Sequence, residues 1–122
     1  MPKIVHFEIP ADEPARAKRF YTEVFGWKVA GWDGSDEYQL AETGPKNDPG
    51  IDGAIIKRAV PGRPTNVTVS VESLDEAVRR LQSAGGTVVS EKEAIPGIGW
   101  HCYCEDTEGN LIGLLQSDAG AK

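Results

Sequence analysis

The chain has 122 residues, of which 39% are hydrophobic and 26% charged, as is ordinary for one soluble globular domain. Lys and Arg number 13 and Asp and Glu 19, so the net charge is 13 − 19 = −6. That balance argues against binding to nucleic-acid phosphates or to an anionic membrane surface. No apolar run approaches the roughly 20 residues of a membrane span, and no signal peptide opens the sequence, so we expect a single cytoplasmic domain over residues 1–122.

The first half of the chain reads as strand, helix and three further strands. Residues 4–10 alternate apolar and polar side chains, which predicts a half-buried strand. A helix is expected next, with its N-terminal cap at Asp12 and its end at Gly26. Strands are then predicted at 27–30, 37–42 and 54–58, the second of them after a solvated loop at 33–37. The predicted apolar stripe of the helix consists of Ala17, Phe20, Tyr21, Val24 and Phe25.

The second half repeats this pattern at an offset of about 60 residues, so that Ala17 corresponds to Ala77 (77 − 17 = 60). Residues 66–71 alternate like the leading strand of the first half. Ser73 with Glu76 forms a capping box at the start of a second helix, which a Gly-Gly pair ends at 85–86. Strands are predicted at 87–90, 100–105 and 111–116, and the acidic run 91–93 is expected to be a solvated loop.

The repeat predicts the fold. We expect an α+β protein in which two tandem βαβββ modules form a curved, mostly antiparallel sheet around a cavity. The modules are residues 1–58 and 65–118, with a linker rich in Pro and Gly at about 59–64.

Polar side chains on three predicted strands suggest a binding site. Each leading strand buries its apolar residues under the following helix, so its alternate residues point to the opposite face. On the strand 100–105, the two cysteines suit packing under a helix, which turns the intervening residues to that same face. We predict that these side chains converge on one cavity that binds a small molecule: His6, Glu8, Asn66, Thr68, His101 and Tyr103.

Cys102 and Cys104 stand two residues apart in a predicted strand, so their side chains share a face. A disulfide between them would close a small, strained ring, which favours two reduced thiols packed as small apolar side chains. A Cys-x-Cys metal site is the alternative, although the chain has no second cysteine pair to complete four ligands.

Several segments in combination resemble the glyoxalase/bleomycin-resistance/extradiol-dioxygenase group, the vicinal oxygen chelate superfamily. The segments run over nearly the whole chain: His-Phe-Glu-Ile-Pro-Ala-Asp at 6–12, Arg-Phe-Tyr at 19–21, Phe-Gly-Trp at 25–27, Ala-Gly-Gly at 84–86 and Glu-Asp-Thr-Glu-Gly-Asn at 105–110. The resemblance implies paired βαβββ modules with a cavity between them. In members that catalyse reactions, it also implies a divalent metal on the cavity floor.

The resemblance places the metal ligands on the first and last strands of each module. His6 holds one of these positions and is a competent ligand. The last strand of the first module offers Ile56, or Lys57 if the register slips by one. The second module offers Asn66 and Gly113, a poor ligand and one with no side-chain donor. We therefore expect no metal or other cofactor. A divalent metal held by a substitute set remains the alternative, with the ligands His6, Glu8 and His101.

Two functions of different class follow. In the first, the protein is a glyoxalase-like lyase or isomerase that acts on a small polar molecule, with Glu8 as general base and His6 as its partner. In the second, it is a non-catalytic protein that sequesters a small molecule, as the bleomycin-resistance relatives do. Glu8 would then be ion-paired at the mouth of the cavity. Fold alone does not choose between the two, and neither function identifies the ligand.

We also predict a homodimer. Two-module sheets of this kind leave exposed strand edges and apolar residues such as Trp32 and Ile51, which association would cover.

Overall fold

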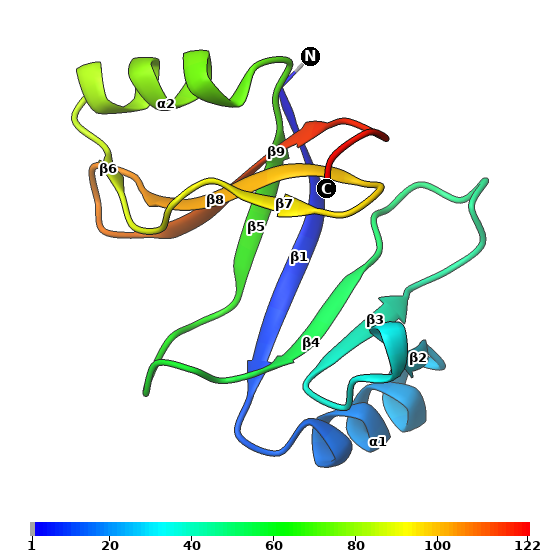
Figure 1. The fold of residues 1–122 in the computed structure, drawn as a ribbon. Helices are drawn as coiled ribbons and strands as arrows, with labels where there is room; N and C mark the ends of the chain where they lie inside the picture. The colour runs from blue at the N-terminus through cyan, green and yellow to red at the C-terminus, as the bar shows by residue number, and fades with distance from the viewer. Residues whose placement is uncertain (1) are drawn as a thin grey trace. The chain divides into compact units, whose positions relative to one another are not determined.

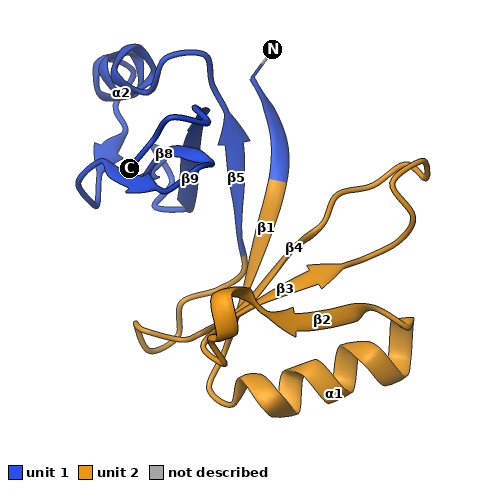
Figure 2. Cartoon of the chain, turned by 45° about the vertical axis from the view of Figure 1, so that its right-hand side comes forward, with its two compact units in different colours: residues 1–5, 66–122 blue, residues 6–65 orange. Residues whose placement is uncertain are grey.

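A computed structural model describes residues 2–122 (Figure 1) and divides them into two compact units (Figure 2). One unit runs from His6 to Thr65, and the other comprises residues 2–5 and 66–122. Each unit contains one α-helix and a set of paired strands. In this part of the chain, neither helix is long and apolar enough to cross a membrane.

The unit 6–65 contains most of β1 (Lys3–Ala11), then α1 (Pro14–Phe25), β2 (Lys28–Gly31), the short 3-10 helix η1 (Trp32–Gly34), β3 (Tyr38–Glu42) and β4 (Gly53–Lys57). Its strands lie in the order β2-β3-β4-β1, with β1 parallel to β4 and the other neighbours antiparallel. One face of these strands packs against α1. The core on that face consists of Ala11, Val29, Ala41 and Ile55, against which Ile9, Ala17, Tyr21 and Trp27 pack.

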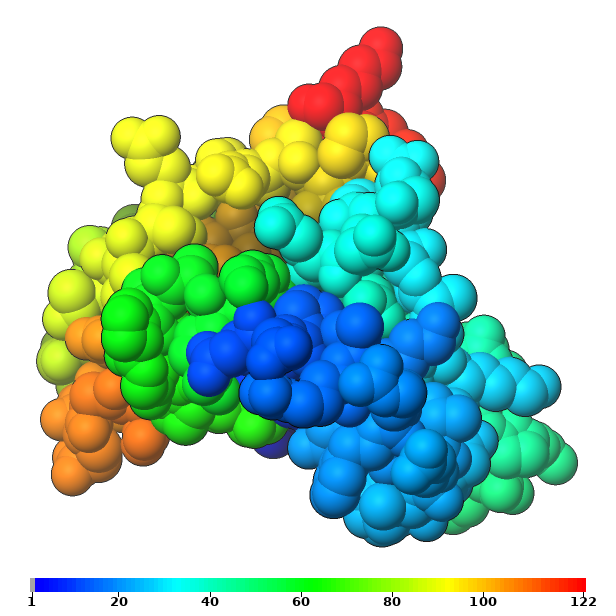
Figure 3. Space-filling view, turned by 90° about the horizontal axis from the view of Figure 1, so that it is seen from below, coloured from blue at the N-terminus to red at the C-terminus, as the bar shows by residue number. Residues whose placement is uncertain are grey.

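Only part of the predicted apolar stripe of α1 is covered. Ala17 and Tyr21 contact the core, whereas Phe20, Val24 and Phe25 are 55%, 55% and 59% exposed. In Figure 3, the lighter blue atoms, which include those of α1, lie uncovered on the face shown. The prediction that the whole stripe is buried was wrong, since only two of its five residues contact the core.

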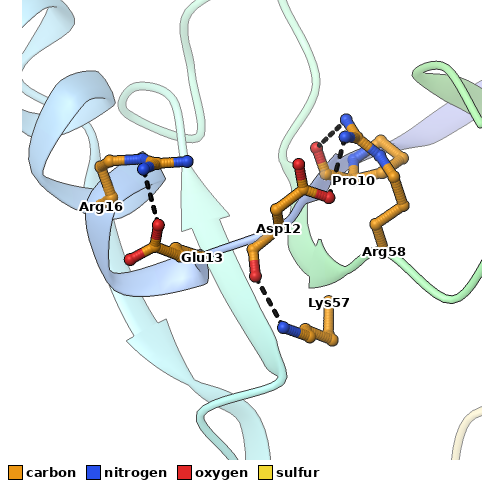
Figure 4. A network of polar contacts seen from close by, with 6 residues as sticks. All are labelled: Pro10, Asp12, Glu13, Arg16, Lys57 and Arg58. Atoms are coloured by element: carbon orange, nitrogen blue, oxygen red, sulfur yellow. Dashed lines mark hydrogen bonds and ion pairs between the residues drawn. The ribbon is translucent and has the colours of Figure 1, made fainter. Parts of the chain in front are cut away.

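The connection from β1 to α1 differs from the predicted cap at Asp12. The N-cap residue is Glu13, whose side chain makes no capping hydrogen bond, and the helix begins at Pro14. The side chain of Asp12 instead accepts a hydrogen bond from Arg58 Nη1 at 3.0 Å, and its carbonyl accepts one from Lys57 Nζ at 2.6 Å (Figure 4). The parallel strands β1 and β4 end side by side. Asp12 therefore binds residues at the end of β4 and does not cap the helix.

The unit 66–122 contains β5 (Asn66–Ser70), α2 (Leu74–Ser83), β6 (Thr87–Val88), β7 (Glu93–Ile95), β8 (Gly99–Glu105) and β9 (Leu111–Ser117). Its strands lie in the order β5-β9-β8-β6, with β5 parallel to β9 and the others antiparallel. Ser73 caps α2 as predicted, its hydroxyl accepting from the Glu76 amide at 3.2 Å. The core under α2 consists of Leu74, Cys102, Cys104 and Leu114.

The second unit has one strand that was not predicted. The acidic run 91–93 was expected to be a solvated loop, but Glu93 begins β7, which pairs antiparallel with β8. The turn between these strands is closed by a hydrogen bond from the Ile98 amide to the Ile95 carbonyl at 2.9 Å. The charged residues at 91–93 favoured a loop, although Glu93 belongs to a short strand that pairs with β8 across a tight turn. The predicted α+β class and the repeated βαβββ order are otherwise confirmed.

Candidate functional site

Two of the predicted site residues, His6 and Glu8, meet a third side chain that the sequence did not single out, Tyr38. His6 Nε2 lies 3.1 Å from the Tyr38 hydroxyl oxygen, and that hydroxyl donates a hydrogen bond to Glu8 Oε2 at 3.3 Å. Glu8 is only 4% exposed, which is unusual for a carboxylate and requires polar partners of this kind. We call these three residues the Glu8 cluster.

Strand pairing builds the Glu8 cluster. Glu8 of β1 pairs with Ala54 of β4, and Ile56 of β4 pairs with Tyr38 of β3, so Glu8 and Tyr38 share one face. The alternate residue Phe7 lies on the other face, where its ring is 5.8 Å from that of Trp27. The Glu8 cluster therefore occupies the face of the strands opposite α1.

Trp32 borders the Glu8 cluster. Its ring centroid is 6.0 Å from that of Tyr38, with the two rings inclined at 63°. Trp32 stands in η1, directly after β2, and is 38% exposed. An aromatic surface is therefore available beside a buried carboxylate, a combination that suits a small ligand with both apolar and polar parts.

The electrostatics of the Glu8 cluster set the direction of its hydrogen bonds. Burial lowers the pKa of His6, although the charges of Glu8 and Asp52 oppose that shift. Burial, and then the charge and hydrogen bond of Glu8, raises the pKa of Tyr38. Tyr38 thus keeps its proton and donates a hydrogen bond to Glu8. A neutral His6 then donates from Nε2 to the Tyr38 oxygen, which leaves Nδ1 as an acceptor.

Two carboxylates act on His6. The charges of Glu8 and Asp52 both oppose the lowering of its pKa. Asp52 is itself paired with Lys46, whose Nζ lies 3.6 Å from Asp52 Oδ2, so Glu8 is the carboxylate that a ligand beside Tyr38 would meet. An anionic ligand group placed there would be disfavoured relative to an uncharged one.

The lowered pKa of His6 predicts a stability that falls in mild acid. Because the folded-state pKa lies below 6.5, the unfolded chain takes up this proton first as the pH drops. Stability from this group is therefore complete above about pH 6.5 and declines as the pH falls below it. We expect urea unfolding to show this decline in the wild type between about pH 7 and pH 5.5, and a shallower one in His6→Gln. Equal slopes in the two proteins would contradict the prediction.

The remaining predicted residues form a second cluster in the unit 66–122. A Cβ atom on Gly113 would lie 2.7 Å from His101 Nε2 and 2.9 Å from Thr68 Oγ1, so the absence of a side chain there makes room for both. The His101 ring meets the Tyr103 ring edge-to-face, with centroids 4.6 Å apart. We call this group, together with Asn66 on the same strand as Thr68, the His101 cluster.

Asn66 gives the His101 cluster an unused acceptor. Asn66 and Thr68 are 4% and 3% exposed. The Asn66 Oδ1 atom is buried and accepts no hydrogen bond from the described residues. Because an unsatisfied buried carbonyl costs roughly 1–3 kcal/mol, a ligand N–H or O–H that reaches it would recover that energy. The predicted residues thus form two clusters, and their convergence on one cavity stays a prediction.

The residues at the family's ligand positions do not fit a divalent metal. Ile56 and Gly113 supply no side-chain donor, and the space at Gly113 is taken by His101 and Thr68. His6, the one good donor of the inherited positions, has its Nε2 at hydrogen-bond distance from Tyr38. Within the described chain, no three His, Cys, Asp or Glu side chains are grouped so as to hold a metal ion. We therefore assign no chemical step to a metal.

Solved structures of similar fold are numerous, although their sequences differ strongly from this one. Methylmalonyl-CoA epimerase from Mycobacterium tuberculosis superposes with a TM-score of 0.67 at 17% identity, covering 94% of this chain and 87% of that one. A methylmalonyl-CoA epimerase in complex with methylmalonyl-CoA and NH4+ gives 0.70 at 16% identity, covering 100% and 99%. A glyoxalase/bleomycin resistance protein/dioxygenase superfamily member from Vibrio splendidus 12B01 gives 0.68 at 13%, covering 96% and 100%.

Sequence identities of 13–17% show a shared fold and do not show a shared function. No curated protein matches the sequence. A family model does match it, over residues 3–114 and therefore across both βαβββ modules. The chain belongs to the Glyoxalase/Bleomycin resistance protein/Dioxygenase superfamily.

Proposed function

We propose that the protein is an isomerase or lyase that moves a proton on a small, uncharged polar molecule, with Glu8 as the general base. The observation that carries this proposal is a carboxylate that is 4% exposed and accepts a hydrogen bond from Tyr38. A carboxylate held away from water by neighbouring groups is a common arrangement for a catalytic base.

Each member of the Glu8 cluster has a separate role in the proposal. Glu8 accepts a proton from a carbon atom next to a carbonyl group and returns it to the same or a neighbouring atom. Tyr38 orients the carboxylate and remains a hydrogen-bond donor, because its pKa is raised. His6 orients Tyr38 through Nε2, so both act as positioning residues.

The His101 cluster is proposed to bind polar groups of the ligand. Asn66 offers a buried acceptor, and Thr68 offers a hydroxyl that lies over Gly113. His101 and Tyr103 add ring surfaces. This assignment predicts a ligand with at least one N–H or O–H donor.

The similar structures support a proton transfer but not their own substrate. Two of them are methylmalonyl-CoA epimerases, and epimerisation moves a proton on carbon. Methylmalonyl-CoA, however, carries a carboxylate and phosphates. The Glu8 carboxylate, buried beside Tyr38, favours a substrate without a negative charge at the reacting end.

Solvent deuterium exchange tests this proposal across a range of candidate substrates. The protein is incubated in D₂O with a panel of small carbonyl compounds, both uncharged and carboxylated, and loss of the α-proton is followed by NMR. We expect exchange with at least one uncharged compound. Compounds that bind, as shown by ligand-observed NMR, but never exchange would contradict the enzyme proposal.

A second candidate is a non-catalytic protein that sequesters a small molecule. The observation in its favour is the poor fit of the inherited ligand positions to a metal. Sequestering needs no base, so ligand affinity would be nearly unchanged in a Glu8→Gln variant. Binding without exchange in the deuterium experiment is the outcome expected for this function.

We further propose a homodimer. Trp32 and Ile51 are 38% and 36% exposed, and the uncovered side of α1 adds Phe20, Val24 and Phe25. Apolar surface of this kind often marks a protein interface. Light scattering should give about twice the chain mass of 13.2 kDa, and the variant Phe25→Ser should shift the particle toward one chain. A wild-type particle of single-chain mass at high concentration would contradict this.

A further inference from the structure

The three most exposed large hydrophobic side chains of residues 2–122 all belong to α1. Phe25 is 59% exposed, and Phe20 and Val24 are each 55% exposed. The Tyr21 ring joins the two phenylalanines, with its centroid 5.1 Å from that of Phe20 and 6.2 Å from that of Phe25. Phe20 and Val24 lie about 40° apart around the helix, because each residue turns it by about 100°. We call Phe20, Val24 and Phe25 the α1 face, which is one continuous apolar surface open to solvent.

Two charged side chains beside the α1 face are placed against the helix dipole. Arg16 stands in the first turn of α1 and Glu23 in the last, whereas the dipole favours acidic residues at the start and basic residues at the end. Both are exposed, and they lie about 20° apart around the helix, on the same side of Phe20. Arg16 pairs with Glu13, but these side chains are 63% and 66% exposed, so the pair stabilises the helix little. The two charges therefore suit a second copy of α1 that runs in the opposite direction.

A cavity lies beside the first half of α1 and has a volume of about 420 Å³. Its apolar walls come from the end of β1 and from α1: Ile9, Pro10, Ala11, Ala17, Phe20 and Tyr21. Two ion pairs also line it, Arg16 with Glu13 and Arg58 with Asp12 (Figure 4). The charges of this lining cancel, so an uncharged aromatic side chain suits the cavity better than an ion.

We propose that two copies of the chain pack α1 against α1, antiparallel, about a two-fold axis at Phe20. This inference rests on the homodimer proposed above and specifies its interface. With the axis there, a residue four positions before Phe20 faces the residue four positions after it in the partner. Arg16 thus lies opposite the partner's Val24 and next to the partner's Glu23. Phe25, five positions after Phe20, lies opposite position 15 of the partner, at the cavity that Ala17 lines.

The antiparallel pair accounts for three features at once. It covers the α1 face, it pairs the first-turn arginine of each copy with the last-turn glutamate of the other, and it inserts one Phe25 into each cavity. The two helix dipoles also oppose each other, which is favourable. Because α1 packs on the strand face opposite the Glu8 cluster, this interface leaves Trp32 exposed beside that cluster for a ligand.

Charge reversal in the full chain tests the interface, with the dissociation constant of the dimer measured by analytical ultracentrifugation. We expect Arg16→Glu and Glu23→Arg each to weaken the dimer roughly 10–100-fold, because symmetry places like charges together twice. The double variant Arg16→Glu/Glu23→Arg restores opposite charges and should recover most of the loss. The two positions are about 10.5 Å apart along one helix, so this recovery reports a contact between copies.

Arg79→Glu is the matched control, because Arg79 forms a similarly exposed pair with Glu76, three residues before it, on α2. It should leave the dimer unchanged. A dimer that resists both single reversals, or that the double variant does not restore, would overturn the α1 interface and leave the homodimer itself standing. A wild-type particle of single-chain mass would instead contradict both. Circular dichroism confirms that each variant is folded.

Discussion

Replacing Glu8 by Gln is expected to slow α-proton exchange by roughly 10²–10⁴-fold, the usual contribution of a positioned general base. Gln has nearly the same shape and still accepts the Tyr38 hydrogen bond through its carbonyl oxygen, but it does not take up a proton. Ligand affinity should change much less than the rate, because the side chain remains in place. Exchange is measured by NMR in D₂O, and affinity by ligand-observed titration.

Two further variants make this result specific. Tyr38→Phe removes the hydroxyl that joins His6 to Glu8, so it should slow exchange and alter the pH profile of the rate. Glu42→Gln, on the exposed end of β3, makes the same chemical change away from the Glu8 cluster and should leave the rate unchanged. If Glu8→Gln and Glu42→Gln lower the exchange rate equally, or if Glu8→Gln leaves the rate unchanged, Glu8 is not the general base.

Ile55→Ala is expected to reduce the free energy of unfolding by roughly 2–5 kcal/mol, the range for truncating a buried Ile to Ala. Ile55 is 0% exposed in β4, and it packs with Ala11, Val29 and Ala41 in the core under α1. Since small proteins are stable by about 5–15 kcal/mol, this single change would remove a large share of the total.

Ile98→Ala provides the matched control for this loss. Ile98 lies in the turn between β7 and β8 and is 46% exposed, so its truncation should change stability by less than about 1 kcal/mol. Both variants are compared with the wild type by urea unfolding followed by circular dichroism. A loss below about 1 kcal/mol for Ile55→Ala would show that the core under α1 does not limit stability.

The local pattern of the sequence predicted the elements and their faces. Alternation along β1 and β5 separated the helix side from the polar side, since side chains of a strand alternate whatever its partner is. Ser73 was identified as the cap of α2 because the capping bond to the Glu76 amide forms within one turn. The cysteines were placed under a helix for the same local reason, and both lie in the core with Leu74.

Neighbours distant in the sequence decided the rest. Tyr38 was missed because its place beside Glu8 depends on β4 pairing with both β1 and β3, and the two residues are 30 positions apart. The predicted cap at Asp12 failed because Arg58, 46 positions away, takes its carboxylate. Thr68 and His101 likewise meet over Gly113 only because β9 lies between β5 and β8.

The sequence by itself therefore determined the repeat, the two faces of each leading strand, and the position of His6 and Glu8 on the polar side of β1. These properties follow from side-chain periodicity and capping, which act over a few residues. Only the tertiary structure decided that Tyr38 links His6 to Glu8, and that the sulfurs of Cys102 and Cys104 are 3.8 Å apart. Such distances depend on strand register and packing, which no local pattern specifies.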